Sequence, residues 1–230
     1  MNSYWKNHYD SISRQFNGSP LKQVGKTVNG REIAEHQIKF IVQNIANVLR
    51  LNESDFVIDL CCGNGLITRQ LAPLVKDIVG VDFTSGLIDA AKRYNSFNNI
   101  EYVISDALSL DPKYFLGLKK IVMYEALQHF NEEQLSVLLD ELNNLGTGSF
   151  VFFGSIPNKE KLNVYYDTEE KYAFYMQRES EGEPHIGRWW LMEEIEQLVS
   201  ERGFKATFLP QEPTLYTAYY RFDVLLEKCQ

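Results

Sequence analysis

The stretch that most constrains the fold is 56–68, where a short apolar run is followed by two glycines and then by a helical pattern. The apolar run 57–60 contains two β-branched residues, as is typical of a strand that is covered on both faces. Gly63 and Gly65 allow positive φ and leave room for a ligand against the backbone. The stretch therefore predicts a strand, a tight loop and a helix N-terminus, an arrangement at which nucleotide-like ligands bind.

Short apolar segments and helical patterns alternate along most of the chain. This alternation predicts a doubly wound α/β fold around a parallel sheet. The predicted strands are 57–60, 78–82, 100–106, 120–124, 150–153, 204–209 and 219–227, and the predicted helices are 31–51, 66–73, 85–94, 134–145 and 191–202.

A chain of 230 residues is long enough for one α/β domain with a full core and too short for two ordinary domains. Residues 1–30 are rich in aromatic residues and interrupted by glycine turns, so we expect short helical pieces that form a cap on the core or a substrate lid. Residues 31–230 are expected to form the main domain. Within it, the aromatic-rich segment 158–190 breaks the rhythm of strands and helices, and we expect a lid-like insertion or a homodimer contact there.

The balance of charges disfavours nucleic acid as a partner. The chain has 23 Lys and Arg against 31 Asp and Glu, a formal net charge of −8, and no basic run that could neutralise phosphates. The cysteines Cys61, Cys62 and Cys229 match no metal-ligand spacing or disulfide framework, so we predict reduced thiols and no metal site. The sequence has neither a signal pattern at its start nor an apolar run of about 20 residues. These features predict a soluble cytoplasmic protein.

Three classes of ligand compete for the glycine loop. A phosphate-binding P-loop needs a lysine after the glycines, and the segment 66–68 supplies none. A dinucleotide-binding loop usually has a third glycine, where this chain has Thr68. Asp59 lies just before the glycines, and a carboxylate there would repel a pyrophosphate but attract a cationic amino group. The loop therefore favours a ligand that carries a positive charge.

The segment Asp59-Leu-Cys-Cys-Gly-Asn-Gly65 resembles the corresponding loop of the class I S-adenosylmethionine-dependent methyltransferases. In that family an acid is followed by glycines at alternate positions, and Cys61 here replaces the residue that is most often the first glycine. The resemblance covers about residues 35–155, and the last two predicted strands fit the antiparallel end of the family's sheet. It implies S-adenosylmethionine as the cofactor and a mostly parallel seven-stranded sheet whose last strand is antiparallel.

The resemblance also implies which residues hold the cofactor. Asp82 ends the second predicted strand, where the family's acid accepts hydrogen bonds from the ribose hydroxyls, and Phe83 would line the adenine. Asp106 ends the third strand and would accept from the adenine amino group, while Tyr124 and Glu125 end the fourth, beside the methionine portion. The cofactor-binding residues implied are Asp59, Cys61, Gly63, Asn64, Gly65, Asp82, Phe83, Ser105, Asp106, Ala107, Tyr124 and Glu125.

His129 is the predicted general base. It follows the fourth strand, where many members of the family have a histidine near the substrate, and an imidazole that titrates near neutrality can accept a hydroxyl proton. A histidine packed at a helix start is the alternative. Replacement of His129 by Ala or Gln is expected to abolish turnover and to leave cofactor binding intact. Tyr9 is the second catalytic candidate, and the predicted substrate contacts are Tyr4, His8, His185, Arg188 and Trp189.

These features favour a methyltransferase of small molecules, with a hydroxyl of a sugar, a nucleotide-sugar or another polar metabolite as the acceptor. The residues Tyr124-Glu-Ala-Leu127 lack the Asn/Asp-Pro-Pro-Tyr motif of the family's nucleic-acid and amide N-methylating branch. One alternative is an N-methyltransferase that acts on a small amine. Another is a non-catalytic scaffold that keeps the fold, against which the intact loop, Asp82 and Asp106 argue.

Overall fold

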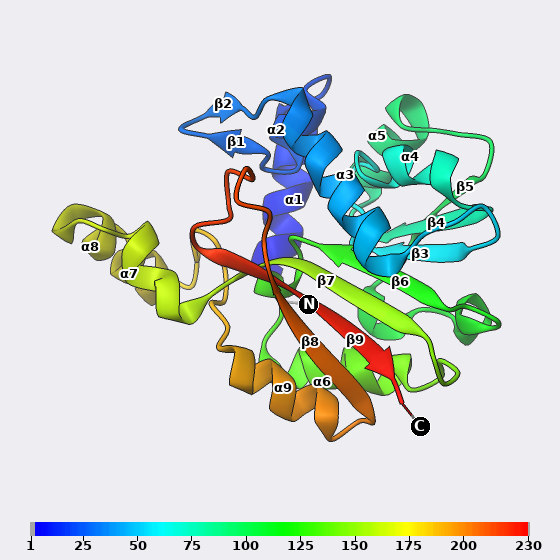
Figure 1. Ribbon diagram of the computed structural model, residues 1–230. Helices are drawn as coiled ribbons and strands as arrows, with labels where there is room; N and C mark the ends of the chain where they lie inside the picture. Colours follow the sequence, from blue (N-terminus) through cyan, green and yellow to red (C-terminus); the bar gives the residue numbers. More distant parts are fainter. Residues whose placement is uncertain (1–2, 230) are drawn as a thin grey trace.

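The computed structural model describes residues 3–229. Its main strands are β3 (Phe56–Leu60), β4 (Asp77–Asp82), β5 (Ile100–Ile104), β6 (Lys120–Tyr124), β7 (Phe150–Pro157), β8 (Phe204–Pro210) and β9 (Arg221–Lys228). They form one seven-stranded sheet in the order β5-β4-β3-β6-β7-β9-β8 (Figure 1). In this sheet β9 runs antiparallel to both of its neighbours, and the other pairs are parallel. The mostly parallel sheet with an antiparallel last strand is thus confirmed.

Helices cover both faces of the sheet, because successive strand residues point to opposite sides. The helices are α3 (Glu35–Leu49), α4 (Thr68–Leu71), α5 (Ser85–Tyr94), α6 (Glu132–Leu142) and α9 (Met192–Ser200). In β6, Ile121 and Met123 belong to the core that contains α6 and α9, whereas Val122 and Tyr124 belong to the core that contains α3 and α4. Figure 1 shows these two layers on opposite sides of the sheet.

Local sequence explains the two helices that cover the centre of the sheet. In α3, Ile38, Ile41 and Ile45 recur at helical spacing and are almost fully buried, so one apolar stripe faces the sheet. At the start of α6, the Asn131 side chain accepts from the backbone of Gln134, whose side chain accepts from the backbone of Asn131. This reciprocal cap fixes where α6 begins, directly after the candidate base His129 and its neighbours.

The N-terminal segment differs in part from the short helical pieces that the sequence predicts. It contains α1 (Ser3–Gln15), α2 (Pro20–Gln23) and a hairpin of β1 (Thr27–Val28) and β2 (Arg31–Glu32). Asn29 and Gly30 both have positive φ, which is the geometry of the tight hairpin turn that an Asn-Gly pair favours. Because this hairpin takes residues 31–32, the first long helix starts at Glu35 and not at the predicted residue 31.

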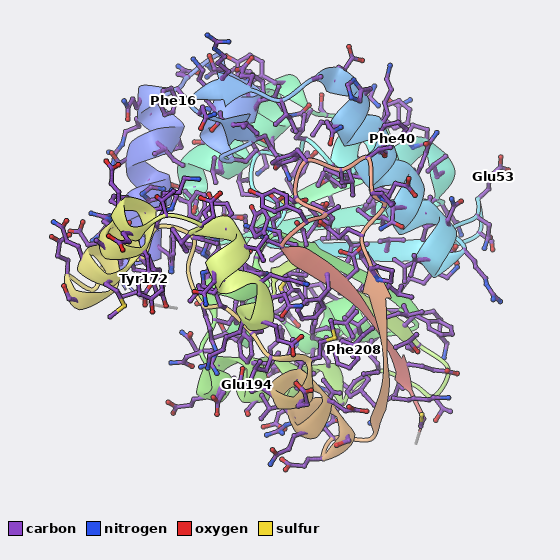
Figure 2. All side chains as sticks on the ribbon, turned by 60° about the vertical axis from the view of Figure 1, so that its left-hand side comes forward. Phe16, Phe40, Glu53, Tyr172, Glu194 and Phe208 are labelled. Atoms are coloured by element: carbon purple, nitrogen blue, oxygen red, sulfur yellow. The ribbon has the colours of Figure 1, made fainter. Side chains whose placement is uncertain are left out.

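The aromatic-rich insertion contains two helices, α7 (Leu162–Tyr165) and α8 (Glu169–Ser180), at one side of the molecule (Figure 1). Its buried rings, Tyr166 and Trp189, pack with Tyr220 from the segment before β9. Tyr172 lies on the exposed side of α8 (Figure 2). The described part of the chain also contains five short 3₁₀ helices: η1 (Ala72–Leu74), η2 (Ala107–Ser109), η3 (Pro112–Phe115), η4 (Leu127–His129) and η5 (Lys159–Lys161). Within residues 3–229, no helix is both long and apolar enough to cross a membrane.

Candidate active site

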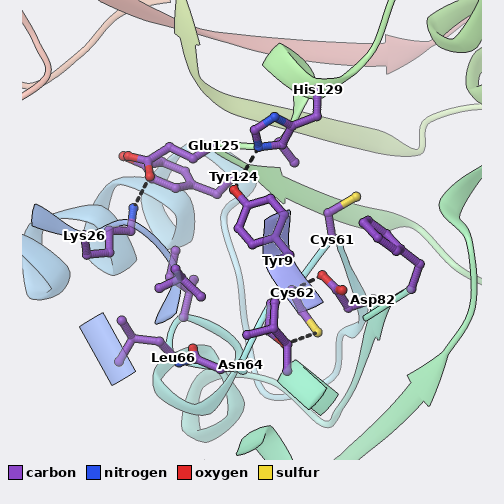
Figure 3. A pocket seen from close by; sticks show the side chains of 16 residues that line it. Tyr9, Lys26, Cys61, Cys62, Asn64, Leu66, Asp82, Tyr124, Glu125 and His129 are labelled. Atoms are coloured by element: carbon purple, nitrogen blue, oxygen red, sulfur yellow. Dashed lines mark hydrogen bonds and ion pairs between the residues drawn. The ribbon is translucent and has the colours of Figure 1, made fainter. Parts of the chain in front are cut away.

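A cavity lies at the carboxyl ends of β3, β4 and β6 (Figure 3). Its walls come from α1, the segment after α2, the glycine loop, the end of β4 and the segment after β6. Seven of the residues predicted to hold the cofactor line it: Cys61, Gly63, Asn64, Asp82, Phe83, Tyr124 and Glu125. The other lining residues are Tyr9, Val24, Lys26, Cys62, Leu66, Ile67, Leu87, Ala126 and His129.

The carboxylate of Asp82 ties the glycine loop to the end of β4. It accepts the backbone N–H of Gly63 at 2.9 Å and that of Thr84 at 2.8 Å. Burial raises the pKa of this carboxyl, and the two N–H donors oppose the rise. Gly63 and Gly65 both have positive φ, and a Cβ at Gly65 would collide with the Tyr102 ring. Glycine is therefore strongly favoured at both positions, and most of all at Gly65, where a side chain would be both strained and in collision with Tyr102.

Cys61 occupies the position of the family's first glycine and has a left-handed backbone, with φ of 58°. A residue with a Cβ is strained there by roughly 1–2 kcal/mol. The conformation that the resemblance requires is thus present, and the cysteine adopts it at some cost in stability.

The backbone strain at Cys61 can be tested with two variants that both remove the thiol. Cys61→Gly is expected to be more stable than Cys61→Ala by about 1 kcal/mol, because alanine keeps the Cβ that disfavours positive φ. Urea unfolding measures the difference. At Cys62, which is not among the residues with positive φ, the order should reverse. Equal stability of the two variants at position 61 would show that the backbone there is unstrained.

Asp59 does not reach the cavity. The residue is 3 % exposed, and its carboxylate accepts a hydrogen bond from the Thr68 hydroxyl at 2.6 Å. Burial raises its pKa to about 7, the Thr68 hydroxyl opposes the rise, and Asp82 adds to it. The side chain points into the first turn of α4, so it supports the turn into the helix and is not placed for the predicted contact with a cationic amino group.

Ser105, Asp106 and Ala107 lie at the end of β5 and the start of η2, outside the lining of the cavity. The Asp106 carboxylate accepts the backbone N–H of Leu108 at 3.0 Å and so caps η2. The contact of Asp106 with adenine stays a prediction.

Sequence reasoning missed Lys26, which forms a buried ion pair with Glu125. The Lys26 Nζ lies 2.6 Å from Oε2 of Glu125, and Lys26 is 3 % exposed. Oε1 of Glu125 accepts from the hydroxyls of Ser155 and Tyr216, both at 3.3 Å. Burial alone would raise the pKa of Glu125, but the positive charges of Lys26 and Arg221 outweigh it and hold the pKa below its ordinary value. One lysine in a polar loop forms no sequence pattern that could have indicated this pair.

Tyr9 and His129 meet inside the cavity (Figure 3). The Tyr9 hydroxyl is hydrogen-bonded to Nε2 of His129 at 3.0 Å, and the Trp5 ring packs on the imidazole with centroids 4.1 Å apart. Burial, with the positive charges of Arg221 and His8, lowers the pKa of His129 to about 3. The prediction that His129 titrates near neutrality is therefore wrong. At neutral pH its imidazole is uncharged and a weak base.

The burial of His129 predicts a dependence of stability on pH. In the unfolded chain the imidazole takes up a proton near pH 6.5, but in the folded chain only near pH 3, so acid favours the unfolded state below pH 6.5. The free energy of unfolding of the wild type, relative to His129→Gln, should fall by about 1 kcal/mol between about pH 7 and pH 5.5. Urea titrations at both pH values measure it. The exposed His36 is the control. If the free energy of unfolding of the wild type relative to His36→Gln falls by the same amount over this pH range, the assignment to His129 is contradicted.

Two of the predicted substrate contacts lie on α1. The Tyr4 hydroxyl accepts a hydrogen bond from Arg178 of α8 at 3.3 Å. His8 packs against Tyr4 and Tyr9, and burial together with the Arg178 charge lowers its pKa. Neither residue lines the cavity. Tyr4 connects α1 to α8, and His8 packs between Tyr4 and Tyr9.

The other predicted substrate contacts fall in two separate places. Arg188 is paired with Glu132 at 2.5 Å and with Glu194 at 3.4 Å. It shares with Trp189 an outer cavity of about 800 Å³, which also includes His129. The third, His185, is hydrogen-bonded to the Tyr166 hydroxyl at 3.2 Å and lines a different, tyrosine-rich cavity. The structure thus brings Arg188 and Trp189 close to His129 but places His185 apart.

Known proteins share the central part of this sequence. Residues 57–146 match the family model described as a methyltransferase domain. The 23S rRNA (uracil(1939)-C(5))-methyltransferase RlmD of Vesicomyosocius okutanii is 42% identical over 69 residues, which are 29% of this chain and 16% of that protein. The ribosomal RNA small subunit methyltransferase A of Rippkaea orientalis is 34% identical over 84 residues, which are 35% of this chain and 31% of that protein. The chain therefore spans less than a third of the length of either relative.

Solved structures are similar over nearly the whole chain. A SAM-dependent methyltransferase from Anabaena variabilis has a TM-score of 0.70 and 18% identity, covering 99% of this chain and 96% of that one. The magnesium protoporphyrin IX methyltransferase of Synechocystis, solved with bound SAH, has a TM-score of 0.68 and 14% identity, covering 99% and 100%. At these identities the likeness establishes the fold. The shared fold and the match of residues 57–146 to a methyltransferase domain both support the resemblance to the class I methyltransferases, whose cofactor is S-adenosylmethionine.

Proposed function

We propose that this protein transfers the methyl group of S-adenosylmethionine to an oxygen atom of a small polar metabolite. The observation that carries the proposal is the cavity at the strand ends, which has a buried carboxylate, Asp82, and a buried ion pair of Lys26 and Glu125. The cofactor has two ribose hydroxyls in its middle and an amino acid of both charges at one end. Its hydrogen-bonding groups and charges therefore match those of the cavity.

Each part of the cofactor has a suitable partner among the lining residues. We assign Asp82 to the ribose hydroxyls and the apolar side chains of Phe83 and Leu87 to the adenine. The carboxylate of Glu125 suits the ammonium group of the methionine portion, and the ammonium of Lys26 suits its carboxylate. When bound, the cofactor supplies a methyl group on a positively charged sulfur, which an electron-rich atom can attack.

We propose that residues 1–30 act as the lid of this site. The helix α1 packs against α5 and carries Tyr9 into the cavity, where it contacts His129. A closed lid excludes water, which favours a reaction that disperses the sulfonium charge. Tyr9 and His129 would then hold the acceptor in line with the methyl group, and such positioning supplies much of the catalysis.

The outer cavity beside His129, about 800 Å³, is large enough for a small metabolite. A hydroxyl of a sugar or nucleotide-sugar is the acceptor that the sequence predicts. With a pKa of about 3, His129 is a weak base and would contribute little to removing the proton of that hydroxyl. An RNA acceptor is the second candidate, because the curated relatives are named as rRNA methyltransferases. Their matches span a minor part of this chain, and its net charge of −8 opposes phosphate binding.

Methyl-labelled S-adenosylmethionine tests both candidates in one assay. The protein is incubated with separate pools of sugars, nucleotide-sugars, small carboxylic acids, small amines and total ribosomal RNA. Label is expected in an oxygen-containing small molecule, with equimolar formation of S-adenosylhomocysteine, and the variant Asp82→Ala serves as the inactive control. Transfer of label to RNA or to an amine instead would contradict the proposal.

A further inference from the structure

The tyrosine-rich cavity that includes His185 lies apart from the cofactor cavity and the outer cavity, and no described residue lines it together with either of them. Its volume of about 530 Å³ is within the range of small-molecule sites. The hairpin of β1 and β2, the helices α7 and α8, and the segment before β9 surround it (Figure 1). Seven of its twelve lining residues carry an aromatic ring, among them Tyr165, Tyr219 and Phe174.

Several of these rings form one cluster whose outer members remain exposed. Tyr220 is buried and packs on both Tyr165 and Tyr219, with ring centroids 4.6 and 4.7 Å apart. The ring planes of Tyr165 and Tyr219 differ by only 11°. Tyr219 is 53% exposed, and Phe174 from α8 is 44% exposed. Large apolar rings that are exposed around one hollow form a surface that a ligand can cover, because covering them removes apolar area from water.

The wall of this cavity, as residues 3–229 form it, carries no unpaired charge. Among the described lining residues, Lys171 is the one with a formal charge, and its Nζ lies 2.6 Å from Oδ1 of Asp167. His185 shares a hydrogen bond of 3.2 Å with the Tyr166 hydroxyl, and burial together with the charge of Arg178 lowers its pKa, so the imidazole is mainly neutral at pH 7. The cavity therefore suits an uncharged ligand better than an anion or a cation.

Tyr216 connects the tyrosine-rich cavity with the cofactor cavity. It lines the former, and its hydroxyl donates to Oε1 of Glu125, which lines the latter, at 3.3 Å. Glu125 is paired with Lys26, and the next residue in the chain, Thr27, lines the tyrosine-rich cavity. The two cavities therefore share a wall at the end that we assign to the methionine portion of the cofactor.

We propose that the tyrosine-rich cavity binds an uncharged, planar aromatic ring, such as a nucleobase or a phenol. The ring stacks on Tyr219 and Phe174, which are exposed in the free protein. Thr27 and Asn29 of the hairpin segment offer a hydroxyl and an amide to polar atoms at the edge of the ring. No bond is made or broken at this site. It goes beyond the proposed methyl transfer, because binding there uses none of the residues assigned to the cofactor.

Five small probes test the inference by calorimetry. The protein is first saturated with S-adenosylhomocysteine, so that no probe occupies the cofactor cavity. Uridine and 4-methylphenol carry a planar ring, 4-methylcyclohexanol has a ring of the same size that is not planar, and glucose and tetramethylammonium represent a sugar and a cation. Uridine or 4-methylphenol is expected to bind about fivefold or more tightly than the other three, because stacking requires a flat π-face. Which of the two planar probes binds more tightly distinguishes a nucleobase from a phenol.

Variants then test whether the planar probe binds at Tyr219. Tyr219→Ala should weaken it about fivefold or more, whereas Tyr219→Phe keeps the ring and should bind it like the wild type. Tyr172→Ala is the matched control, since Tyr172 on α8 is also exposed, at 41%, but does not line this cavity (Figure 2). A cooperative urea transition shows that each variant is folded.

Three results would overturn the inference. One is the absence of saturable binding of either planar probe at millimolar concentration. Another is binding of 4-methylcyclohexanol, glucose or tetramethylammonium as tightly as the planar probes. The third is an equal loss of affinity in Tyr219→Ala and Tyr172→Ala, which would place the planar probe outside the tyrosine-rich cavity. Failure of the wild type to bind S-adenosylhomocysteine would instead overturn the proposed function, and the comparison of Tyr219→Ala with Tyr172→Ala would still test this site.

Discussion

Replacement of Asp82 by alanine is expected to weaken the binding of S-adenosylhomocysteine by more than about a hundredfold. The ribose hydroxyls would lose two hydrogen bonds to a charged acceptor, each of which contributes about 1.5–3 kcal/mol. The variant also releases the backbone N–H of Gly63, so the glycine loop loses the contact that fixes it to β4. Isothermal titration calorimetry of the wild type and the variant measures the effect.

Asp77 gives a matched control for Asp82, because it lies at the other end of the same strand. Its side chain is exposed at the amino end of β4, far along the strand from the cavity. Asp77→Ala should bind S-adenosylhomocysteine like the wild type. The variant Asp82→Asn, which keeps the shape but not the charge, should lie between the wild type and Asp82→Ala. An unchanged affinity in Asp82→Ala would remove Asp82 from the cofactor site.

Loss of Lys26 should produce the largest change in stability. Lys26→Met leaves the carboxylate of Glu125 buried without its ion-pair partner, and breaking a buried pair in this way costs about 3–5 kcal/mol. Urea unfolding at neutral pH measures the free energy. The double variant Lys26→Met with Glu125→Gln removes both charges and should recover part of the loss, since neither position then carries an unpaired charge.

The exposed pair of Lys171 and Asp167 is the control for this experiment. Its two ends are 2.6 Å apart, as in the buried pair, but both side chains are 56% exposed. Lys171→Met should therefore cost less than about 1 kcal/mol. If Lys26→Met costs no more than Lys171→Met, the pair does not hold the N-terminal segment to the sheet.

The main strands could be predicted because each is an apolar run bounded by turn residues. The segment 120–124 was predicted as a strand and is β6. The third strand ends at Ile104 and not at residue 106, because Asp106 caps η2. The strand β7 continues to Pro157, four residues beyond the prediction, because its pairing with β9 resumes at Ile156 after an irregularity. The end of a strand depends on the neighbouring strands with which it pairs. These lie elsewhere in the chain, so the local sequence does not show where the strand ends.

The candidate site could be predicted where it belongs to a motif and not where it depends on tertiary contacts. The position of Asp82 follows from its place at a strand end. The pairing of Lys26 with Glu125 joins residues 99 positions apart. The low pKa of His129 arises from burial under α1, which a sequence pattern does not reveal. The turn at Asn29 and Gly30, in contrast, carries a signal that favours a hairpin.

The cavity beside the glycine loop is the proposed binding site of S-adenosylmethionine. Titration of the wild-type protein with S-adenosylhomocysteine, and in parallel with ATP and NAD, tests it directly. These ligands represent the three classes that compete for a strand, glycine loop and helix. Saturable binding of one S-adenosylhomocysteine per chain, with no heat from ATP or NAD at the same concentration, is the predicted result. No binding of S-adenosylhomocysteine, or equal binding of NAD, would contradict it.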